Sequence, residues 1–255
     1  MKINGIDIAE YGAEQWNLEP GYSTAANTSE WQSGMLSPIL VPSSLGMKKM
    51  KVSVIVRGRD RAQIWERSRE LVSILMKPSV VEFDGFHSLF NCVLTDVKQV
   101  ESSLNRFHKT VLELTGIECS TSYASNTFTV RGGGEYRGSI SNHGDMDTPA
   151  IIRIRRSSAF DLSMEGLFGN KFSIGDNFLE IKEETITGGT ILIINGESGK
   201  VIIGSGDEEN STAAFGKINK MTEFPNLKKG ENEFYINNRS RAELNLTIMH
   251  RSRYL

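Results

Sequence analysis

The most regular alternation of apolar and polar positions in the chain predicts one amphipathic helix. The residues that recur with the 3.6-residue period of a helix are Ile64, Leu71 and Leu75. Asp60, followed three residues later by Gln63, supplies side-chain oxygens for the free amides of a helix start. Pro78 lacks a backbone N–H and disfavours helical geometry in the residue before it. The sequence therefore predicts a helix over Arg61–Met76.

Strand patterns with a two-residue period surround this helix. Val52, Val54 and Val56 alternate with the residues between them, as expected of a strand with two different faces. The strands predicted in this part are Lys51–Arg57, Val80–Phe83, Leu89–Val97 and Phe107–Thr115. Together they indicate an α+β domain, in which one helix lies on a mostly antiparallel sheet.

The second half of the chain contains short strand patterns and no helical pattern of useful length. The strands predicted there are Asn126–Val130, Ala150–Arg156, Ala159–Met164, Phe178–Ile181, Thr190–Ile194, Lys200–Ile203, a strand through Phe234 and Ile236, and Glu243–Ile248. Turns rich in Gly, Asn and Asp separate them at intervals typical of a β-sandwich. A small polar joint begins at Ser120, so the predicted domains are residues 1–119 and 120–255.

Between Gly21 and Met47, Gly, Pro and Ser interrupt any strand or helix of normal length, yet the segment is apolar. A loop this long is uncommon unless it has a function. We expect its large apolar side chains to pack against a neighbouring subunit; the alternative is that they pack on their own domain. The residues predicted to form this subunit interface are Trp31, Met35, Leu36, Ile39, Leu40 and Leu45.

Composition and charge exclude several classes of protein. The 255 residues are 38% hydrophobic and 24% charged, which is typical of a folded globular protein. The formal net charge of −2 gives no long-range attraction for nucleic acid or acidic membranes. No apolar run reaches the roughly 18 residues of a bilayer-spanning helix, and no signal peptide is expected. Cys92 and Cys119 are too few for a disulfide framework, so a reducing setting fits.

The candidate chemical motifs do not assemble into a catalytic or metal site in the sequence. Gly132–Gly134, followed by Gly138, precede no helix that could hold a phosphate, and we interpret these glycines as turn residues. The four histidines, His87, His108, His143 and His250, show no metal-ligand spacing. The clustered acids are Asp145 with Asp147, and Asp207 with Glu208 and Glu209. We interpret them as solvated turn residues, with a loop calcium site as the alternative. We therefore expect no enzyme activity, no cofactor and no metal.

A β-sandwich also raises the question of sugar binding, which usually needs an aromatic platform. The three tryptophans, Trp16, Trp31 and Trp65, all lie in the first predicted domain. A carbohydrate-binding module that helps attachment to a host cell wall therefore remains the alternative function. A hydrolase of cell-wall polymer would need an acid pair or a metal site that the sequence does not present.

The order of these elements resembles the distal tail proteins of siphophages. In the first domain the resemblance rests on a short N-terminal strand with Asn4, Gly5 and Asp7, the apolar loop, the capped helix, and a strand ending in Glu113, Leu114, Thr115 and Gly116. In the second it rests on Asn142, Gly144, Asp145, Thr148 and Pro149 before Ile151, Ile152 and Ile154. The ending also matches, with Phe224, Pro225, Leu227, Gly230, Glu231 and Asn232, then Leu244, Ile248, Arg251, Arg253, Tyr254 and Leu255.

This resemblance implies a mainly β protein, with a barrel-like α+β first domain that forms a hexameric ring and a galectin-like antiparallel β-sandwich. It implies a structural hub of the virion tail tip, made in the cytoplasm of the bacterial host, that leaves a channel for DNA. The partners implied are other copies of the chain, the tail tube protein, tail tip or tail-associated proteins, and receptor-binding proteins, without specific nucleic-acid recognition. The sugar-binding cluster of galectins is absent, so the likeness to galectins concerns shape.

Overall fold

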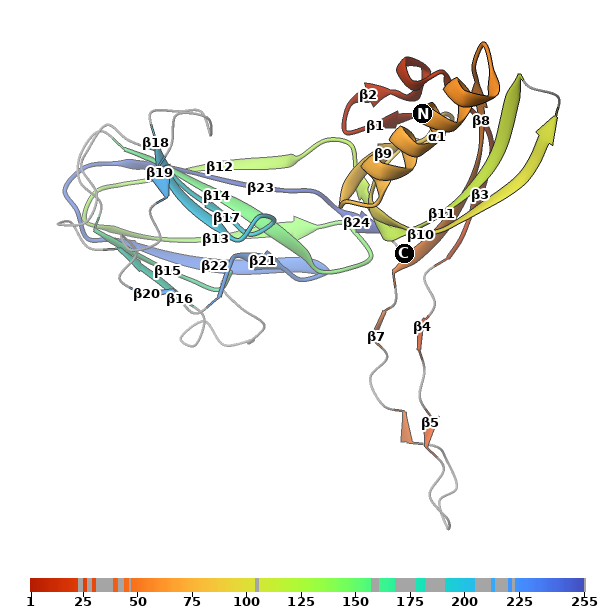
Figure 1. Ribbon diagram of the computed structural model, residues 1–255. Coiled ribbons are helices and arrows are strands. Elements are labelled where there is room, and N and C mark those ends of the chain that lie inside the picture. The colour runs from red at the N-terminus through yellow and green to blue at the C-terminus, as the bar shows by residue number, and fades with distance from the viewer. Residues whose placement is uncertain are drawn as a thin grey trace. The chain divides into compact units, whose positions relative to one another are not determined.

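The computed structural model describes residues 1–22, 25–26, 29–30, 39–40, 44–45, 47–103, 106–156, 161–167, 178–181, 191–204, 212–213, 220–221 and 223–254. The chain divides into two compact units (Figure 1). The first consists of Met1–Thr121 with Tyr254–Leu255, and the second of Ser122–Arg253. Within the described ranges, no helix is both long and apolar enough to cross a membrane.

The first unit is built on a curled, eight-stranded antiparallel sheet with the order β2-β1-β9-β10-β11-β8-β3, to which β24 adds beside β11. Its strands are β1 (Lys2–Ile3), β2 (Ile6–Asp7), β3 (Ala13–Pro20), β8 (Lys48–Arg57), β9 (Ser79–Glu82), β10 (Ser88–Ser103), β11 (Phe107–Ser120) and β24 (Arg253–Tyr254), with a 3₁₀ turn, η1, at Ile8–Tyr11. Four two-residue strands pair outside this sheet: β4 (Ala25–Ala26), β5 (Ser29–Glu30), β6 (Ile39–Leu40) and β7 (Ser44–Leu45).

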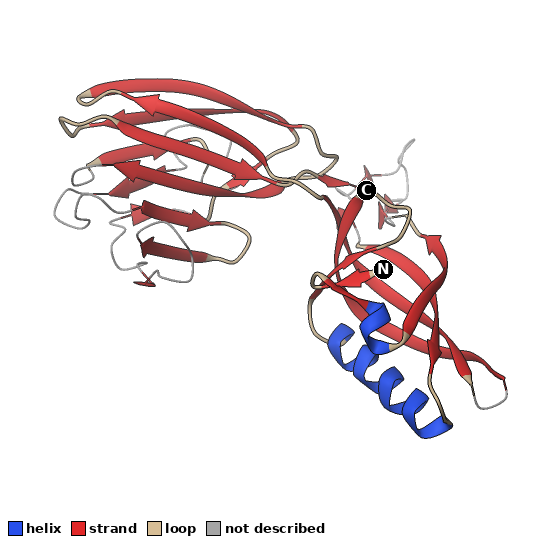
Figure 2. Cartoon of the chain, turned by 90° about the horizontal axis from the view of Figure 1, so that it is seen from above, coloured by secondary structure: helices blue, strands red, loops and turns tan. Residues whose placement is uncertain are grey.

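The helix α1 (Arg61–Leu75) lies against this sheet, as Figure 2 shows. The Asp60 side chain accepts a hydrogen bond from the Gln63 amide at 2.8 Å, and the Gln63 side chain accepts one from the Arg59 amide at 2.8 Å. Both hydrogen bonds of the predicted helix cap are therefore present. The core-facing side chains of the helix are Ile64, Leu71 and Leu75, each at most 2% exposed. The helix prediction is confirmed, and its burial fixes α1 on the sheet.

The second unit is a β-sandwich of a seven-stranded and a five-stranded antiparallel sheet. The seven-stranded sheet contains β12 (Ala124–Val130), β14 (Thr148–Arg156), β17 (Ile191–Asn195), β18 (Lys200–Gly204), β19 (Thr212–Ala213), β21 (Asn226–Leu227) and β23 (Leu244–His250). The five-stranded sheet contains β13 (Gly134–Asn142), β15 (Leu162–Glu165), β16 (Phe178–Ile181), β20 (Lys220–Met221) and β22 (Gly230–Asn238). The predicted fold class, an α+β first part followed by a sandwich, is confirmed.

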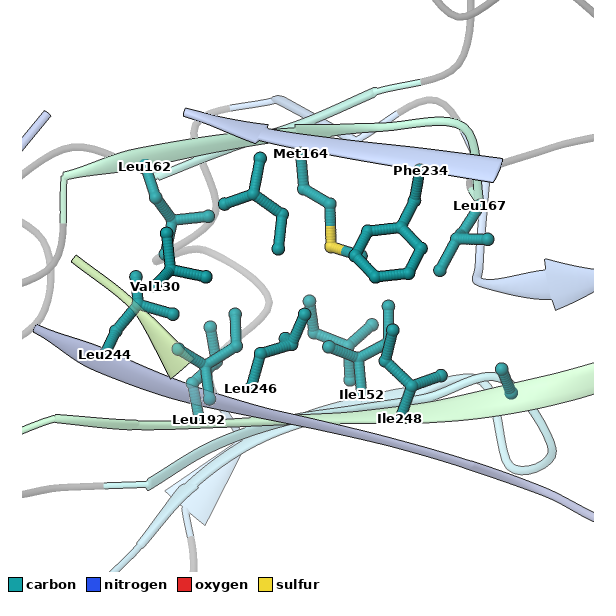
Figure 3. Packing of buried hydrophobic residues seen from close by; sticks show 14 of the residues in the cluster. Val130, Ile152, Leu162, Met164, Leu167, Leu192, Phe234, Leu244, Leu246 and Ile248 are labelled. Carbon is teal, nitrogen blue, oxygen red and sulfur yellow. The ribbon is translucent and has the colours of Figure 1, made fainter. Parts of the chain in front are cut away.

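The two sheets of the sandwich enclose an apolar core (Figure 3). Met164 and Phe234 point inward from the five-stranded sheet, and Ile152, Leu246 and Ile248 point toward them from the seven-stranded sheet. All five side chains are at most 1% exposed. Alternate residues of each strand therefore fill the core, as the two-residue period in the sequence predicts.

Two of the longer strands, β3 and β13, were missed by the sequence patterns for different reasons. β3 is largely polar, and it holds its place at the sheet edge by pairing with β8 from Ala13↔Val56 to Pro20↔Met50. β13 contains Gly138, which a sequence pattern assigns to a turn. A Cβ at Gly138 would lie 2.6 Å from Phe234 Cζ and 2.8 Å from Tyr136 Cε1. Gly138 is therefore a strand residue whose missing side chain leaves room for two aromatic rings.

The long strands of the first sheet also exceed their predicted lengths. β10 extends to Ser103 and β11 to Ser120, beyond the predicted ends at Val97 and Thr115. Two register shifts interrupt the β10–β11 ladder, one at Leu94/Asp96 and the other at Gln99/Glu101. Both shifts skip a residue on β10, and a bulge of this kind breaks the two-residue alternation of that strand while its pairing continues. β11 continues past Thr115 without a bulge, because Gly116–Ser120 pair with Cys92–Ser88 of β10.

Candidate assembly surfaces

The residues predicted to contact another subunit lie in what we call the arm, the segment that contains β4, β5, β6 and β7. Trp31, Met35 and Leu36 fall outside the described residues, whereas Ile39 and Leu40 form β6 and Leu45 ends β7. β4 pairs with β7, and β5 pairs with β6, both antiparallel. The two ladders are nested, so the chain runs out and back along itself. Each of these strands is only two residues long, which agrees with the expectation that no strand of normal length forms here. The interface itself remains a prediction.

The arm continues the β3–β8 hairpin in almost the same register. Pro20 pairs with Met50 at the end of that hairpin, Ala25 pairs with Leu45 in the next ladder, and Glu30 pairs with Ile39 in the last. The register changes by no more than one residue over the three ladders. The arm is thus a prolongation of one edge of the eight-stranded sheet. A two-stranded ribbon is at best marginally stable alone in water, so such an arm gains from a partner surface.

The base of the arm is held by a close backbone approach and an ion pair. A Cβ at Gly21 would lie 1.8 Å from the Lys49 carbonyl oxygen, so only glycine fits at this point. The Lys48 ammonium contacts the Glu118 carboxylate on β11, and these side chains are only 9% and 19% exposed. A large part of that pair is screened from water, where removing one partner costs more than at the surface. The large exposed side chains beside the base are Tyr22 and Met47.

The edge strand β3 carries an exposed tryptophan. A register shift interrupts the β3–β8 ladder between Gln15 and Asn17, and Trp16 lies at that irregularity with 60% of its surface exposed. The Lys109 ammonium lies 5.9 Å from the centre of the indole ring. Bulges re-aim side chains and protect sheet edges from unwanted pairing. Trp16 is therefore a large exposed aromatic side chain on the edge strand that leads into the arm.

An apolar groove, which we call the α1 groove, lies between α1 and the strands β10 and β11. Its volume is about 420 Å³. The residues of its wall and floor include Trp65, Val72, Met76, Val97, His108 and Thr110. Three of them are exposed in spite of their apolar character: Trp65 at 45%, Met76 at 68% and Val97 at 39%. Trp65 and His108 pack edge to face with ring centres 5.4 Å apart, which fixes the indole at the groove wall.

Sequence reasoning identified the core-facing stripe of α1 and missed this groove. The helix carries a second apolar stripe, Trp65, Val72 and Met76, one position further along than Ile64, Leu71 and Leu75. That second stripe was the available signal. From the sequence alone, this second stripe cannot be distinguished from a wider core-facing surface of the helix. The distinction depends on where the sheet beneath the helix ends, which the sequence does not show.

A charged cluster joins β8, β10 and β11 in the same sheet. Lys98 lies 3.1 Å from Asp96 and 3.0 Å from Glu113, and Lys51 lies 3.5 Å from Glu113. The hydrogen bond from Lys98 lowers the pKa of both Asp96 and Glu113, and the hydrogen bond to Glu113 raises the pKa of Lys98. The cluster stays ionised at neutral pH and balances its own charges, which suits a polar contact surface better than acid–base catalysis.

The five-stranded sheet of the sandwich carries a polar recess of about 350 Å³, whose lining includes Arg137, Glu231, Glu233 and Tyr235. The Arg137 guanidinium lies 5.7 Å from the centre of the Tyr235 ring, and a hydrogen bond with Glu135 raises the pKa of Tyr235. The recess therefore presents a partly covered tyrosine among acids. This differs from the open aromatic platform that usually binds a sugar ring.

The acids and histidines considered as metal ligands are used elsewhere or lie apart. Asp147 accepts a hydrogen bond from the Lys229 amide at 3.0 Å, and Asp145 lies 3.8 Å from the Lys229 ammonium. Asp207, Glu208 and Glu209 lie outside the described residues. In the part of the chain that the structure describes, no three His, Cys, Asp or Glu side chains are placed to hold a metal ion. Asp145 and Asp147 thus tie a turn to the segment before β22.

Comparisons with known proteins find similarity in structure and none in sequence. No family model matches the chain, and no curated protein matches it. The fold matches the crystal structure of the SPP1 Dit protein, which is described as a paradigm of the hub adsorption apparatus in phages that infect Gram-positive bacteria. The TM-score is 0.65 at 15% identity, over 99% of this chain and 98% of that one.

Chains of the phage P2 baseplate in its activated conformation have the same fold. In the calcium form the TM-score is 0.55 at 9% identity, over 96% of this chain and 92% of the other. In the strontium form the TM-score is 0.52 at 10% identity, over 94% of this chain and 92% of the other. The fold implied by the resemblance to siphophage distal tail proteins is therefore confirmed over nearly the whole chain. At these identities the likeness establishes the fold alone.

Proposed function

We propose that this protein is a structural hub of the tail tip of a long-tailed bacteriophage, joining the tail tube to the baseplate or tip proteins. The observation that carries the proposal is the structural match to SPP1 Dit, which covers 99% of this chain, and so both of its units, and 98% of the other chain. The role is architectural, so no substrate turnover is part of it.

In this proposal the first unit forms a closed ring, with six copies as in the family that the chain resembles, around a passage for DNA. The sandwich is carried on the ring and contacts other tip components. The features of the first unit that support ring formation are the arm at one sheet edge, the exposed Trp16 beside it and the open α1 groove. Other copies of the chain, the tail tube protein, tail-associated proteins and receptor-binding proteins are the proposed partners, in a mature virion.

The interface prediction made from the sequence becomes part of this proposal. Trp31, Met35, Leu36, Ile39, Leu40 and Leu45 are the proposed contacts from the arm to a neighbouring copy. Burying a large apolar side chain contributes about 1.5–3 kcal/mol, so four or five of them supply on the order of 10 kcal/mol per subunit. Ordering of the arm opposes this gain, at about 1–2 kcal/mol for each residue that becomes fixed on association. Association should therefore be concentration-dependent.

Light scattering on the full chain over a wide concentration range tests the proposal. We expect a defined higher-order species with the mass of a closed ring, and a visible ring in negative-stain micrographs. A protein that stays monomeric at the highest concentration, and does not bind tail tube protein, would refute the hub role.

A binding assay of the full chain against cell-wall glycans separates the hub from the alternative, a carbohydrate-binding module. The hub role predicts no saturable affinity for glycans. Saturable binding by protein that does not assemble would favour the module and count against the hub.

A further inference from the structure

We infer that the α1 groove is the receiving surface for the arm of a second copy of this chain. The inference rests on the proposed ring and adds to it the partner of the arm. A ring of identical subunits joined head to tail needs two different surfaces on each subunit, one complementary to the other. The arm is one such surface, and the groove has the character of the other.

The α1 groove has the features of a binding surface, because it gathers several exposed apolar side chains around one hollow. Trp65, Met76 and Val97 are 45%, 68% and 39% exposed, although they stand together around one hollow of about 420 Å³. Single exposed apolar residues are ordinary on a protein surface, whereas a hollow lined by several of them marks a binding surface. A volume of this size admits one or two large apolar side chains and suits the apolar residues that the sequence places in the arm.

The register of the sheet separates the groove from the arm of the same chain. On the groove floor, His108 pairs with Val56 of β8 and Thr110 pairs with Val54. The arm leaves the sheet at the other end of β8, before Lys48. Six to eight strand residues separate the two positions, which corresponds to roughly 20–26 Å at about 3.3 Å per residue.

The direction of the arm points to the same conclusion. Its ladders continue the β3–β8 register from Pro20↔Met50 to Glu30↔Ile39, so each further pair lies further along the hairpin from Val54 and Val56. The arm therefore leads away from the groove of its own chain. The arm and the α1 groove therefore lie at opposite ends of β8. This separation allows the arm of one copy to contact the groove of the next copy around a ring.

Charge substitutions in the groove test the inference. Val97→Asp places a carboxylate on the groove wall at a position already 39% exposed, and Ile6→Asp is its matched control, since Ile6 is a strand residue that is 42% exposed outside the groove. We expect Val97→Asp to weaken self-association at least about tenfold, the effect of losing one well-buried interface contact, and Ile6→Asp to leave it near the wild-type value. Met76→Asp, at a position 68% exposed, gives an independent readout if Val97→Asp unfolds.

Cross-linking provides a direct test of the contact. Full-length Ile39→Cys and Met76→Cys are mixed and treated with a short bismaleimide, so that a product joining the two substitutions can only be intermolecular. The native Cys92 and Cys119 are 5% and 3% exposed and should react little. We expect a covalent dimer from this mixture and none when Ile6→Cys replaces Met76→Cys.

The outcomes distinguish the inference from the function on which it rests. Loss of assembly in the groove variants, together with the specific cross-link, supports the inference. Rings that form normally with Val97→Asp and Met76→Asp, without the cross-link, would overturn the inference while the hub proposal stands. Wild-type protein that remains monomeric in every condition would overturn both.

Discussion

Replacing Gly138 with alanine should destabilise the sandwich by crowding its aromatic corner. Phe128, Tyr136 and Phe234 form this corner, with ring centres 5.0 Å apart for Phe128–Phe234 and 6.1 Å apart for Tyr136–Phe234. The added Cβ would meet Phe234 Cζ at 2.6 Å and Tyr136 Cε1 at 2.8 Å, whereas ordinary contacts begin at 3.4 Å. The two rings must therefore retreat by roughly 0.8 and 0.6 Å, inside an interior packed as densely as an organic crystal.

The magnitude follows from two opposing effects. Overpacking of this kind costs about 1–3 kcal/mol, while replacing glycine with alanine in the unfolded chain returns about 0.4–1 kcal/mol. We expect a net loss of about 1–2 kcal/mol in the free energy of unfolding, and a fall in Tm of roughly 3–8 °C. Gly134→Ala, on the same strand, is the control, because its nearest contact is a single carbonyl oxygen at 3.3 Å.

Scanning calorimetry measures the shift, and tryptophan fluorescence assigns the transition, since all three tryptophans belong to the first unit. The double variant Gly138→Ala/Phe234→Leu should recover part of the loss relative to the sum of the single variants, because the smaller side chain makes space for the new methyl group. If Gly138→Ala melts at the wild-type temperature, or if the two changes are strictly additive, the packing argument is wrong.

Three further predictions concern other parts of the molecule. Asp60→Ala removes the N-cap of α1 and should lower the free energy of unfolding by about 1 kcal/mol in denaturant titrations, with Asp60→Asn restoring most of it. Burial, with a smaller contribution from the nearby His143, lowers the pKa of His250, whose ring nitrogens contact no hydrogen-bond partner within the described residues. The unfolded chain then binds the proton first, so stability should be complete above pH 6.5 and fall as the pH drops below it; His250→Phe should flatten this dependence in thermal melts, and an unchanged slope would contradict it. Burial raises the pKa of Cys92 to about 12, so iodoacetamide at pH 8 should modify it only after unfolding, as peptide mass mapping would show.

The parts of the fold that were predictable are those in which local chemistry and burial agree. Asp60 and Gln63 form the cap that their spacing predicts, and Ile64, Leu71 and Leu75 form the buried face of α1. Leu246 and Ile248 alternate with polar neighbours on β23 and face the sandwich core. In such elements one period in the sequence corresponds to one buried surface, so the pattern is sufficient.

The elements that were missed depend on partners distant in sequence. β3 is stabilised by its ladder with β8, whose residues are 30 to 43 positions further along the chain, and not by its own alternation. Gly138 lies in a strand because it pairs with Phe234 of β22, and a local sequence pattern cannot show this distant pairing. The α1 groove requires the position of Val97 relative to Met76, and these residues meet only when the helix lies on the sheet. Long-range pairing therefore decides both the edge strand and the candidate site.

The common register of the arm and the β3–β8 hairpin constrains how this segment could change length. One residue inserted in only one of the two paired segments of the arm, the one with β4 and β5 or the one with β6 and β7, would shift every pair beyond the insertion. The side chains of that segment beyond the insertion would then point to the opposite face of the ribbon. Residues inserted opposite each other in both segments would leave the pairing in register and lengthen the arm by only about 3.3 Å for each pair. Related chains that fit wider or narrower assemblies should therefore differ here by matched, symmetric insertions.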